Sequence, residues 1–142
     1  MIAGEESSGF GFLDYNDRDG IVSSIYIIHL IIESGLSISQ ILESINKITG
    51  PTYIGRKDLE FNSRNRSDLI NALKNVKAND IYDFGLSYVD ERDGLKFSYN
   101  DGSWILIRIS GTENLIRIYS ESINQETADI MIANLIKCID LS

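Results

Sequence analysis

The stretch SWILIRISGTENLIRIY, residues 103–119, decides the fold of this chain. Two apolar segments, 103–109 and 115–121, are rich in isoleucine and leucine and flank a short polar segment that contains Gly111. Side chains of this kind fit the pleated surface of a sheet, and a glycine permits the sharp turn between neighbouring strands. The pattern therefore predicts two antiparallel strands joined by a tight loop.

The residues around this hairpin extend the sheet. Asp93-Gly94 and Asn100-Asp101-Gly102 are turn signals, because glycine tolerates the positive φ that tight turns require. Apolar residues at three- and four-residue spacing predict helices over 66–77 and 124–139. Further strands are predicted over 52–60, 82–90 and 94–98. Residues 53–142 thus predict an α+β domain, in which two helices cover one face of an antiparallel sheet of about four to five strands.

Residues 1–50 have a different pattern and form a second part of the chain. A short strand-like segment at the start precedes a loop rich in glycine and serine and an acidic turn. Asp19 is expected to cap a helix over 20–34, since its carboxylate can accept hydrogen bonds from free first-turn N–H groups. A second helix is predicted over 37–48, and Gly50-Pro51 then marks the domain boundary.

Length, charge and cysteine usage limit the function. At 142 residues the chain has room for one ordinary domain, or for a small domain with part of another. Its net charge of −8 disfavours a general nucleic-acid or anionic-membrane binder, which needs a basic face. The single cysteine cannot form a disulfide within the chain, and the apolar run from Ile21 to Ile32 is shorter than the ~20 residues of a membrane-spanning helix. We therefore expect a cytoplasmic protein without nucleic-acid or membrane partners.

The polar loop of the hairpin is suited to binding a phosphate group. Gly111 allows a sharp turn in which successive backbone N–H groups converge on an anion. Ser110 and Thr112 add hydroxyl groups, and Arg108 offers several donors to phosphate oxygens. Arg117 follows nine residues after Arg108 on the returning strand and could reach the same anion. The same residues also fit a plain hairpin with a polar turn and two exposed arginines.

A second candidate site lies near the start of the chain. Gly4-Glu5-Glu6-Ser7-Ser8-Gly9 places carboxylates and hydroxyls in a glycine-bounded loop. Carboxylates accept hydrogen bonds from hydroxyl groups, so a sugar is a suitable ligand, and the alternative is a solvated loop. The acidic turn that follows does not fit a calcium loop. With Gly20 in the sixth position, Tyr15 and Tyr26 would stand where the first and last ligands are required.

Both loops, in this order, resemble the C-terminal end of the α-D-phosphohexomutases, the family of phosphoglucomutase and phosphomannomutase. The matching blocks are Gly4-Glu5-Glu6-Ser7, Arg18-Asp19-Gly20-Ile21, Asp101-Gly102-Ser103-Trp104, Arg108-Ile109-Ser110-Gly111-Thr112-Glu113 and Leu115-Ile116-Arg117-Ile118-Tyr119. The resemblance implies that residues 53–142 are the family's fourth, phosphate-binding domain, which is similar to the TATA-box-binding protein. Residues 1–50 would be the C-terminal remnant of its third, α/β domain with the sugar-binding loop.

The resemblance also implies an activity and a set of site residues. Members of this family interconvert hexose 1-phosphate and hexose 6-phosphate through a phosphoserine and a bisphosphate intermediate. The residues that would hold the substrate phosphate are Arg108, Ser110, Gly111, Thr112 and Arg117. Glu5 and Ser7 would bind the sugar hydroxyls. The Glu-Glu-Ser form of this loop is more similar to a phosphoglucomutase, and phosphomannomutase specificity is the alternative.

Two parts of the family's machinery do not occur in this sequence. The catalytic serine loop and the magnesium loop of the family lie in its first two domains, and neither motif is present here. We therefore expect a fragment that binds sugar and phosphate, is inactive alone, and has the missing N-terminal domains of its parent enzyme as partners. Magnesium would be bound by the parent outside this chain. The alternatives are a stand-alone phosphosugar-binding module and an assembly domain that uses the isoleucine-rich helix.

Overall fold

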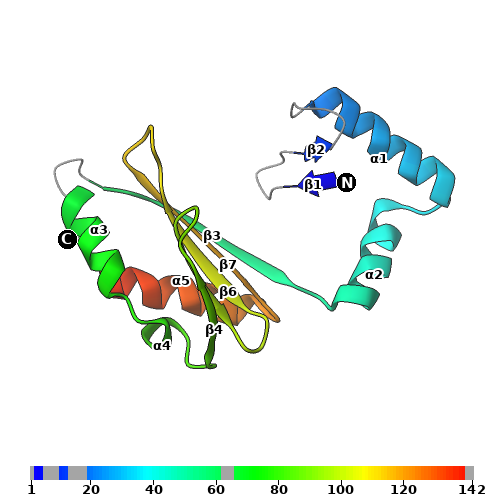
Figure 1. Cartoon of the computed structure of the whole chain (residues 1–142). Helices are drawn as coiled ribbons and strands as arrows, with labels where there is room; N and C mark the ends of the chain where they lie inside the picture. Colours follow the sequence, from blue (N-terminus) through cyan, green and yellow to red (C-terminus); the bar gives the residue numbers. More distant parts are fainter. Residues whose placement is uncertain (1, 5–9, 13–18, 62–65, 140–142) are drawn as a thin grey trace. The chain divides into compact units, whose positions relative to one another are not determined.

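The computed structural model describes residues 2–4, 10–12, 19–61 and 66–139. Its contacts divide the chain into two compact units, Met1–Thr49 and Gly50–Ser142. Each unit has its own strands and helices (Figure 1).

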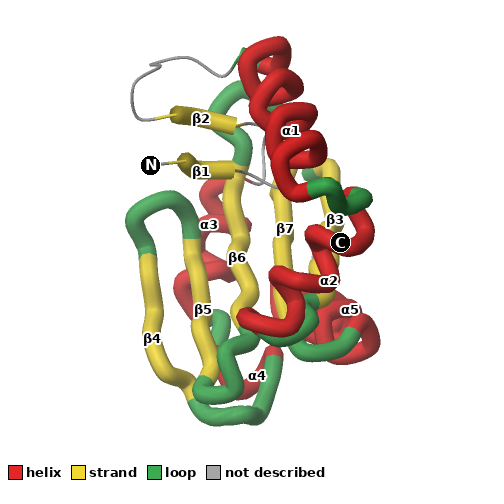
Figure 2. The backbone as a smooth tube through the Cα atoms, turned by 90° about the vertical axis from the view of Figure 1, so that its right-hand side faces the viewer, coloured by secondary structure: helices red, strands yellow, loops and turns green. Residues whose placement is uncertain are grey.

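The second unit is built on a five-stranded antiparallel sheet. Its strand order is β3-β7-β6-β5-β4, so the first of these strands in sequence pairs with the last. In chain order its elements are β3 (Tyr53–Glu60), α3 (Arg66–Asn75), α4 (Ala78–Ile81), β4 (Leu86–Asp90), β5 (Leu95–Tyr99), β6 (Trp104–Ile109), β7 (Leu115–Ser122) and α5 (Gln125–Ile139). The predicted α+β architecture is confirmed, and the helices of this unit gather on one face of the sheet (Figures 1 and 2).

The strand predicted over 82–90 begins later than expected. One helical turn, α4, precedes it, and the strand starts at Leu86. Between the two elements, Tyr82 stacks on Phe84 with their ring centroids 5.7 Å apart. Gly85 has a φ of 71°, which lies outside the strand region. The segment before Leu86 is therefore a bend that leads from the helical side of the unit into the sheet.

Alternating apolar residues form the core between the sheet and its helices. The most deeply buried large side chains of β6, β7 and α5 are Ile105, Ile107, Ile116, Ile118, Met131, Leu135 and Ile139. Burying a side chain of this size contributes roughly 1.5–3 kcal/mol. The residues that alternate with these isoleucines point to the other face, so β6 and β7 have one buried face and one less buried face with mixed apolar and charged side chains.

Gly55 allows α5 to lie close to β3. A Cβ atom at this position would stand 2.5 Å from Ser120 Oγ and 2.8 Å from Ile132 Cδ1. Side-chain carbons do not approach other atoms so closely, so a larger residue would push the helix or its neighbours away. Ser120 Oγ donates a hydrogen bond to the Ala128 carbonyl at 2.9 Å across this contact. The glycine therefore sets the distance between the sheet and α5 on the side of β3.

The face of the sheet away from the helices carries aromatic and charged side chains. In the register of β6 and β7, Arg108 stands opposite Arg117. On the neighbouring strand, Lys96 Nζ lies 4.2 Å from the ring centroid of Trp104. A cation over an aromatic ring at an exposed site is stabilised by ~0.5–1 kcal/mol. The charged groups of the central hairpin thus lie on a face that the helices of this unit do not cover.

The first unit contains a two-stranded ribbon and two helices. Its elements are β1 (Ile2–Gly4), β2 (Phe10–Phe12), α1 (Gly20–Ser34) and α2 (Ile38–Thr49). β1 and β2 pair antiparallel, so the segment predicted as a loop contains a second short strand. Asp19 caps α1 as predicted, because its Oδ1 accepts hydrogen bonds from the N–H groups of Ile21 (2.8 Å) and Val22 (3.1 Å). Gly35 ends the helix with a φ of 64°.

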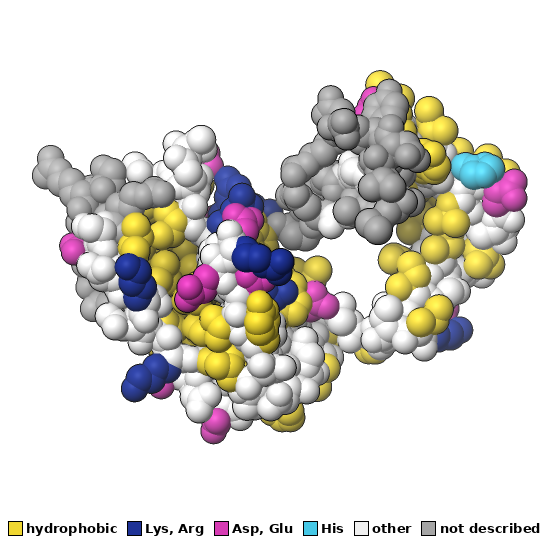
Figure 3. All heavy atoms as spheres, viewed as in Figure 1, with side chains coloured by type: hydrophobic (Ala, Val, Ile, Leu, Met, Phe, Trp, Pro, Cys, Tyr) yellow, Lys and Arg dark blue, Asp and Glu magenta, His cyan; other side chains and the backbone are white. Residues whose placement is uncertain are grey.

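The helices of the first unit expose many apolar side chains, which are visible in the space-filling view (Figure 3). No residue of α1 is buried, and Ile21 and Ile32 are 75% and 71% exposed. Within the described residues, no single helix has the length and hydropathy to cross a membrane. α1 and α2 reach those values only as a pair, and the chain bends by 84° between them.

Candidate phosphate site

The β6–β7 hairpin brings two arginines face to face. Arg108, near the end of β6, and Arg117, near the start of β7, are direct partners in the register. The Ser110 N–H donates to the Leu115 carbonyl at 2.8 Å and closes the hairpin. Like charges directly opposite each other destabilise a sheet, unless anions lie nearby. The structure thus brings together the two arginines that the sequence analysis placed at one site.

The loop between these strands has N–H groups available to a ligand. Ser110 Oγ accepts a hydrogen bond from the Glu113 N–H at 3.2 Å, which holds the loop in a compact turn. Gly111 and Thr112 are exposed at the tip. Within the described part of the chain, their N–H groups donate to no acceptor. Two adjacent donors of this kind can converge on one anion.

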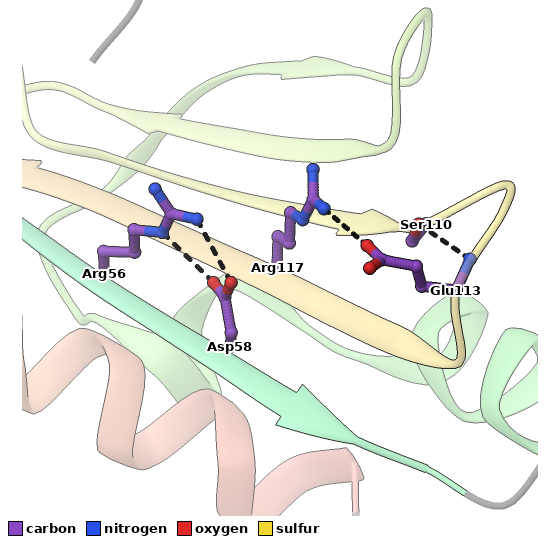
Figure 4. A network of polar contacts seen from close by, with 5 residues as sticks. All are labelled: Arg56, Asp58, Ser110, Glu113 and Arg117. Carbon is purple, nitrogen blue, oxygen red and sulfur yellow. Dashed lines mark hydrogen bonds and ion pairs between the residues drawn. The ribbon is translucent and has the colours of Figure 1, made fainter. Parts of the chain in front are cut away.

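Arg117 has one donor satisfied and another without a partner. Its Nη2 donates to Glu113 Oε2 at 2.8 Å, and the two side chains point toward each other (Figure 4). Its Nε is buried and makes no hydrogen bond with the residues that the structure describes. Leaving a buried donor unpaired costs about 1–3 kcal/mol. A ligand oxygen that reached this guanidinium edge would remove that cost.

Arg108 is held more loosely than Arg117. Its Nε lies 3.3 Å from Asp93 Oδ1 in the turn between β4 and β5. The two side chains are 52% and 73% exposed, and ion pairs between exposed groups contribute only about 0–1 kcal/mol. The Arg108 guanidinium therefore remains accessible to a stronger partner.

A second ion pair lies beside Arg117 on β3. Arg56 Nε and Nη2 donate to the two carboxylate oxygens of Asp58, each at 3.1 Å (Figure 4). Asp58 is the register partner of Arg117. The hydrogen bond from Arg56 is the main cause that lowers the pKa of Asp58; burial opposes it, and the charges of Arg56 and Arg117 lower the pKa further. Asp58 is therefore ionised at neutral pH. It compensates part of the positive charge of the two facing arginines.

A cavity of about 600 Å³ opens beside Arg108. Its walls come from α3, the turn between β4 and β5, and the start of the hairpin loop. Its lining is partly apolar and partly charged, with two cations and two carboxylates: Ile70, Leu73, Ile109, Lys74, Arg108, Glu91 and Asp93. This volume lies within the range of ligand pockets, ≈ 300–1,000 Å³. A ligand held by the loop would thus have an apolar wall beside it, with both cationic and acidic side chains in the lining of the same cavity.

Some predicted site residues lie elsewhere, and some contacts were not predicted. Glu5 and Ser7, the predicted sugar-binding residues, lie outside the described residues. Sequence reasoning missed the roles of Arg56, Asp58 and Glu113. Glu113 had a signal, because it is the one acidic side chain in the hairpin loop. The sequence carries no such signal for Arg56 and Asp58, because nothing in β3 indicates its register with β7.

Two family models account for the two units. The model described as "Phosphoglucomutase/phosphomannomutase, C-terminal domain" matches residues 61–136. The model described as "Phosphoglucomutase/phosphomannomutase, alpha/beta/alpha domain III" matches residues 1–48. The hairpin with the facing arginines thus lies in the C-terminal domain of that family.

Individual relatives show the same likeness. The chain is 30% identical over 128 residues to the phosphoglucomutase/phosphomannomutase of Thermococcus kodakarensis, across 89% of this chain and 26% of that protein. It is 29% identical over 140 residues to the phosphoglucosamine mutase of Clostridium novyi, across 98% of this chain and 27% of that protein.

A solved structure shares the fold. It is the crystal structure of a phosphoglucomutase/phosphomannomutase family protein from Burkholderia thailandensis, with a TM-score of 0.68 and 21% identity, and the match covers 96% of this chain and 27% of that one. The chain spans about a quarter of the length of the curated relatives it matches. Because the C-terminal domain model alone covers more than half of the sequence, the chain belongs to the phosphoglucomutase/phosphomannomutase family.

Proposed function

We propose that this chain is the phosphate-binding end of a phosphohexomutase that interconverts hexose 1-phosphate and hexose 6-phosphate. One observation carries the proposal. Arg108 and Arg117 are directly opposite each other on β6 and β7, beside a loop whose Gly111 and Thr112 N–H groups have no acceptor among the described residues. Family membership supports a phosphosugar as the ligand.

In the proposed site the phosphate lies against the two arginines and the loop. Arg108 and Arg117 donate to its outer oxygens, and these charge-assisted hydrogen bonds are roughly twice as strong as neutral ones. The N–H groups of Gly111 and Thr112 and the Thr112 hydroxyl donate from the loop. Ser110 completes the set, and its Oγ also keeps the loop in shape by accepting a loop N–H at 3.2 Å. The phosphate is therefore bound by groups fixed on a rigid hairpin.

The proposed role of this chain is to hold the phosphate that is not being transferred. Phosphoryl transfer between the substrate and a phosphoserine would take place in the parent enzyme, at a serine outside this chain. Glu5 and Ser7 would bind the sugar hydroxyls in both orientations of the bisphosphate. We also propose that magnesium binds to the parent outside this chain, because the magnesium loop of the family does not occur in this sequence. Alone, the chain would bind substrate without turnover.

The preferred substrates are glucose phosphates, with mannose phosphates as the alternative, because the Glu5-Glu6-Ser7 sequence is more similar to that of phosphoglucomutases. A second candidate function is a stand-alone phosphosugar-binding module. It is supported by the location of the two arginines and their loop in a unit, Gly50–Ser142, that has its own core. The two functions differ in one measurable property. Only the mutase gains activity when a polypeptide with the remaining domains is added.

Titration of the purified chain with glucose 6-phosphate, followed by amide NMR at low salt, tests the site. The Gly111 and Thr112 signals are expected to move with glucose 6-phosphate and not with glucose. Arg117→Gln should remove most of this response. The matched control is Arg92→Gln, which changes an arginine that is 86% exposed and pairs with Asp90. Unchanged Gly111 and Thr112 signals in the unaltered chain would refute the proposed site.

A further inference from the structure

Each arginine of the proposed site already has a carboxylate partner. Arg117 Nη2 donates to Glu113 Oε2 at 2.8 Å, and Arg108 Nε lies 3.3 Å from Asp93 Oδ1. Neither carboxylate can help to bind phosphate, because two anions repel each other. In the free chain each of these two positive charges thus has a carboxylate beside it, and an incoming anion is repelled by that carboxylate or displaces it.

The loop itself holds Glu113 in place. The Glu113 N–H donates to Ser110 Oγ at 3.2 Å, and the Ser110 N–H donates to the Leu115 carbonyl at 2.8 Å. These two hydrogen bonds fix the backbone from which the Glu113 side chain reaches back to Arg117 (Figure 4). The loop that offers N–H groups to an anion therefore also holds a carboxylate against one of the arginines.

The position of Asp93 is set by the turn between β4 and β5. Gly94 has a φ of 107°, and a Cβ atom on it would collide with the Ile107 carbonyl oxygen on β6. The turn is therefore packed directly against β6. This packing brings the preceding residue, Asp93, within reach of Arg108. The backbone conformation of the loop and of the turn thus places both acidic residues next to the arginines that they contact.

Resting on the proposed function, we infer that Glu113 and Asp93 are internal competitors of phosphate that make the site selective for doubly charged phosphate groups over singly charged anions. A phosphate monoester carries about −1.5 to −2 charges and three acceptor oxygens at neutral pH. Its oxygens can accept hydrogen bonds from both arginines and from the loop N–H groups together. It thereby compensates each arginine for the loss of its carboxylate partner. A chloride ion has one charge and replaces only one of these contacts.

The exposed fractions of the paired side chains determine how strongly Glu113 and Asp93 compete with phosphate. The Arg117 and Glu113 side chains are 35% and 54% exposed, so solvent screens the pair, and the competition is modest. Removing the Glu113 charge is therefore expected to tighten phosphate binding about 1.4- to fivefold, the range that exposed ion pairs span. Asp93 is 73% exposed, so removing its charge should have a smaller effect in the same direction.

Glu113→Gln tests the inference, because it keeps the size of the side chain and removes its charge. Asp83→Asn is the matched control: it removes one negative charge from an exposed residue that makes no ion pair among the described residues. Asp93→Asn provides a second variant on a separate turn. Each chain is titrated with inorganic phosphate in chloride-free buffer, and the Gly111 and Thr112 amide signals are followed. The titration is repeated with sodium chloride alone.

Glu113→Gln should bind phosphate about 1.4- to fivefold more tightly than the unaltered chain, and its loop signals should begin to respond to chloride. Asp83→Asn should match the unaltered chain in both titrations. Weaker binding by Glu113→Gln, or binding equal to that of Asp83→Asn, would overturn the inference while leaving the proposed phosphate site intact. If the unaltered chain and all three variants bind no phosphate, the proposed function is refuted together with the inference.

Discussion

Replacing Arg117 by methionine is expected to stabilise the free chain and to abolish its response to phosphate. Arg117 stands opposite Arg108 in the register, and its buried Nε has no hydrogen-bond partner among the described residues. Methionine keeps an unbranched apolar stem and removes both the charge and the unpaired donor. Because Arg117 destabilises the free chain but is needed to bind phosphate, its replacement should raise the free energy of unfolding and remove phosphate binding.

The structure gives the magnitude of the change in the free energy of unfolding. The unpaired buried donor costs about 1–3 kcal/mol, and methionine relieves that cost. The lost ion pair with Glu113 involves side chains that are 35% and 54% exposed, so it contributes only about 0.2–1 kcal/mol. The difference is a net stabilisation on the order of 1 kcal/mol, which raises the thermal midpoint of a domain of this size by about 4–8 °C.

Urea unfolding followed by the fluorescence of Trp104 measures this change. Trp104 is the single tryptophan of the chain and lies on β6, so it reports on the second unit. Phosphate at ten times its Kd should stabilise the unaltered chain by about 1.4 kcal/mol and leave Arg117→Met unchanged. Arg92→Met is the control for the loss of one arginine. If Arg117→Met is less stable than the unaltered chain, or if phosphate stabilises both equally, the expected role of Arg117 is refuted.

Three further predictions concern packing, titration and activity. Gly55→Ala should lower the free energy of unfolding of the second unit by about 1–3 kcal/mol, because its Cβ would meet Ser120 and Ile132; an unchanged urea midpoint would show that α5 moves freely. The hydrogen bonds from Arg92 lower the pKa of Asp90 to about 2, so this pair stabilises the fold above the ordinary carboxyl pKa and loses its effect as the pH falls toward 2. In Arg92→Gln the Asp90 pKa should return toward 3.8, which carboxyl NMR titration can measure, and a value that stays near 2 would exclude Arg92 as the cause. The purified chain should not convert glucose 1-phosphate to glucose 6-phosphate in a coupled assay, and activity that survives removal of contaminating mutase would contradict the proposed division of roles.

The elements that were predicted well are those whose pattern is local. β6 and β7 alternate buried residues with half-buried or exposed ones, and the loop between them is short, so the sequence predicted that Arg108 and Arg117 can reach the same anion. Their direct pairing in the register was found in the structure. Helix α1 was equally clear, because Asp19 and Gly35 mark its two ends. In these segments, the local signals and the final structure agree.

The elements that were missed depend on partners far away in the sequence. α4 is four residues long, too short for a helical periodicity, and it is held by tertiary contacts such as the Tyr99 hydroxyl that donates to the Ala78 carbonyl at 2.9 Å. β2 is three residues long and forms only because β1 pairs with it. The ion pair between Arg56 and Asp58 lies beside Arg117 through a strand register that no local pattern specifies.

The pairing of β3 with β7 has a consequence for the order in which the chain folds. The paired residues of these two strands, from Tyr53 with Ser122 to Glu60 with Leu115, are between 55 and 69 positions apart in sequence. During synthesis on a ribosome, β3 therefore leaves the exit tunnel long before β7, the strand with which it pairs in the described sheet. The meander of β5, β6 and β7 can form from short-range contacts first, whereas β3 must wait with its backbone hydrogen-bonding groups open to other chains. A nascent chain stalled before residue 115 should accordingly be prone to aggregate through β3, and release of β7 should end that exposure.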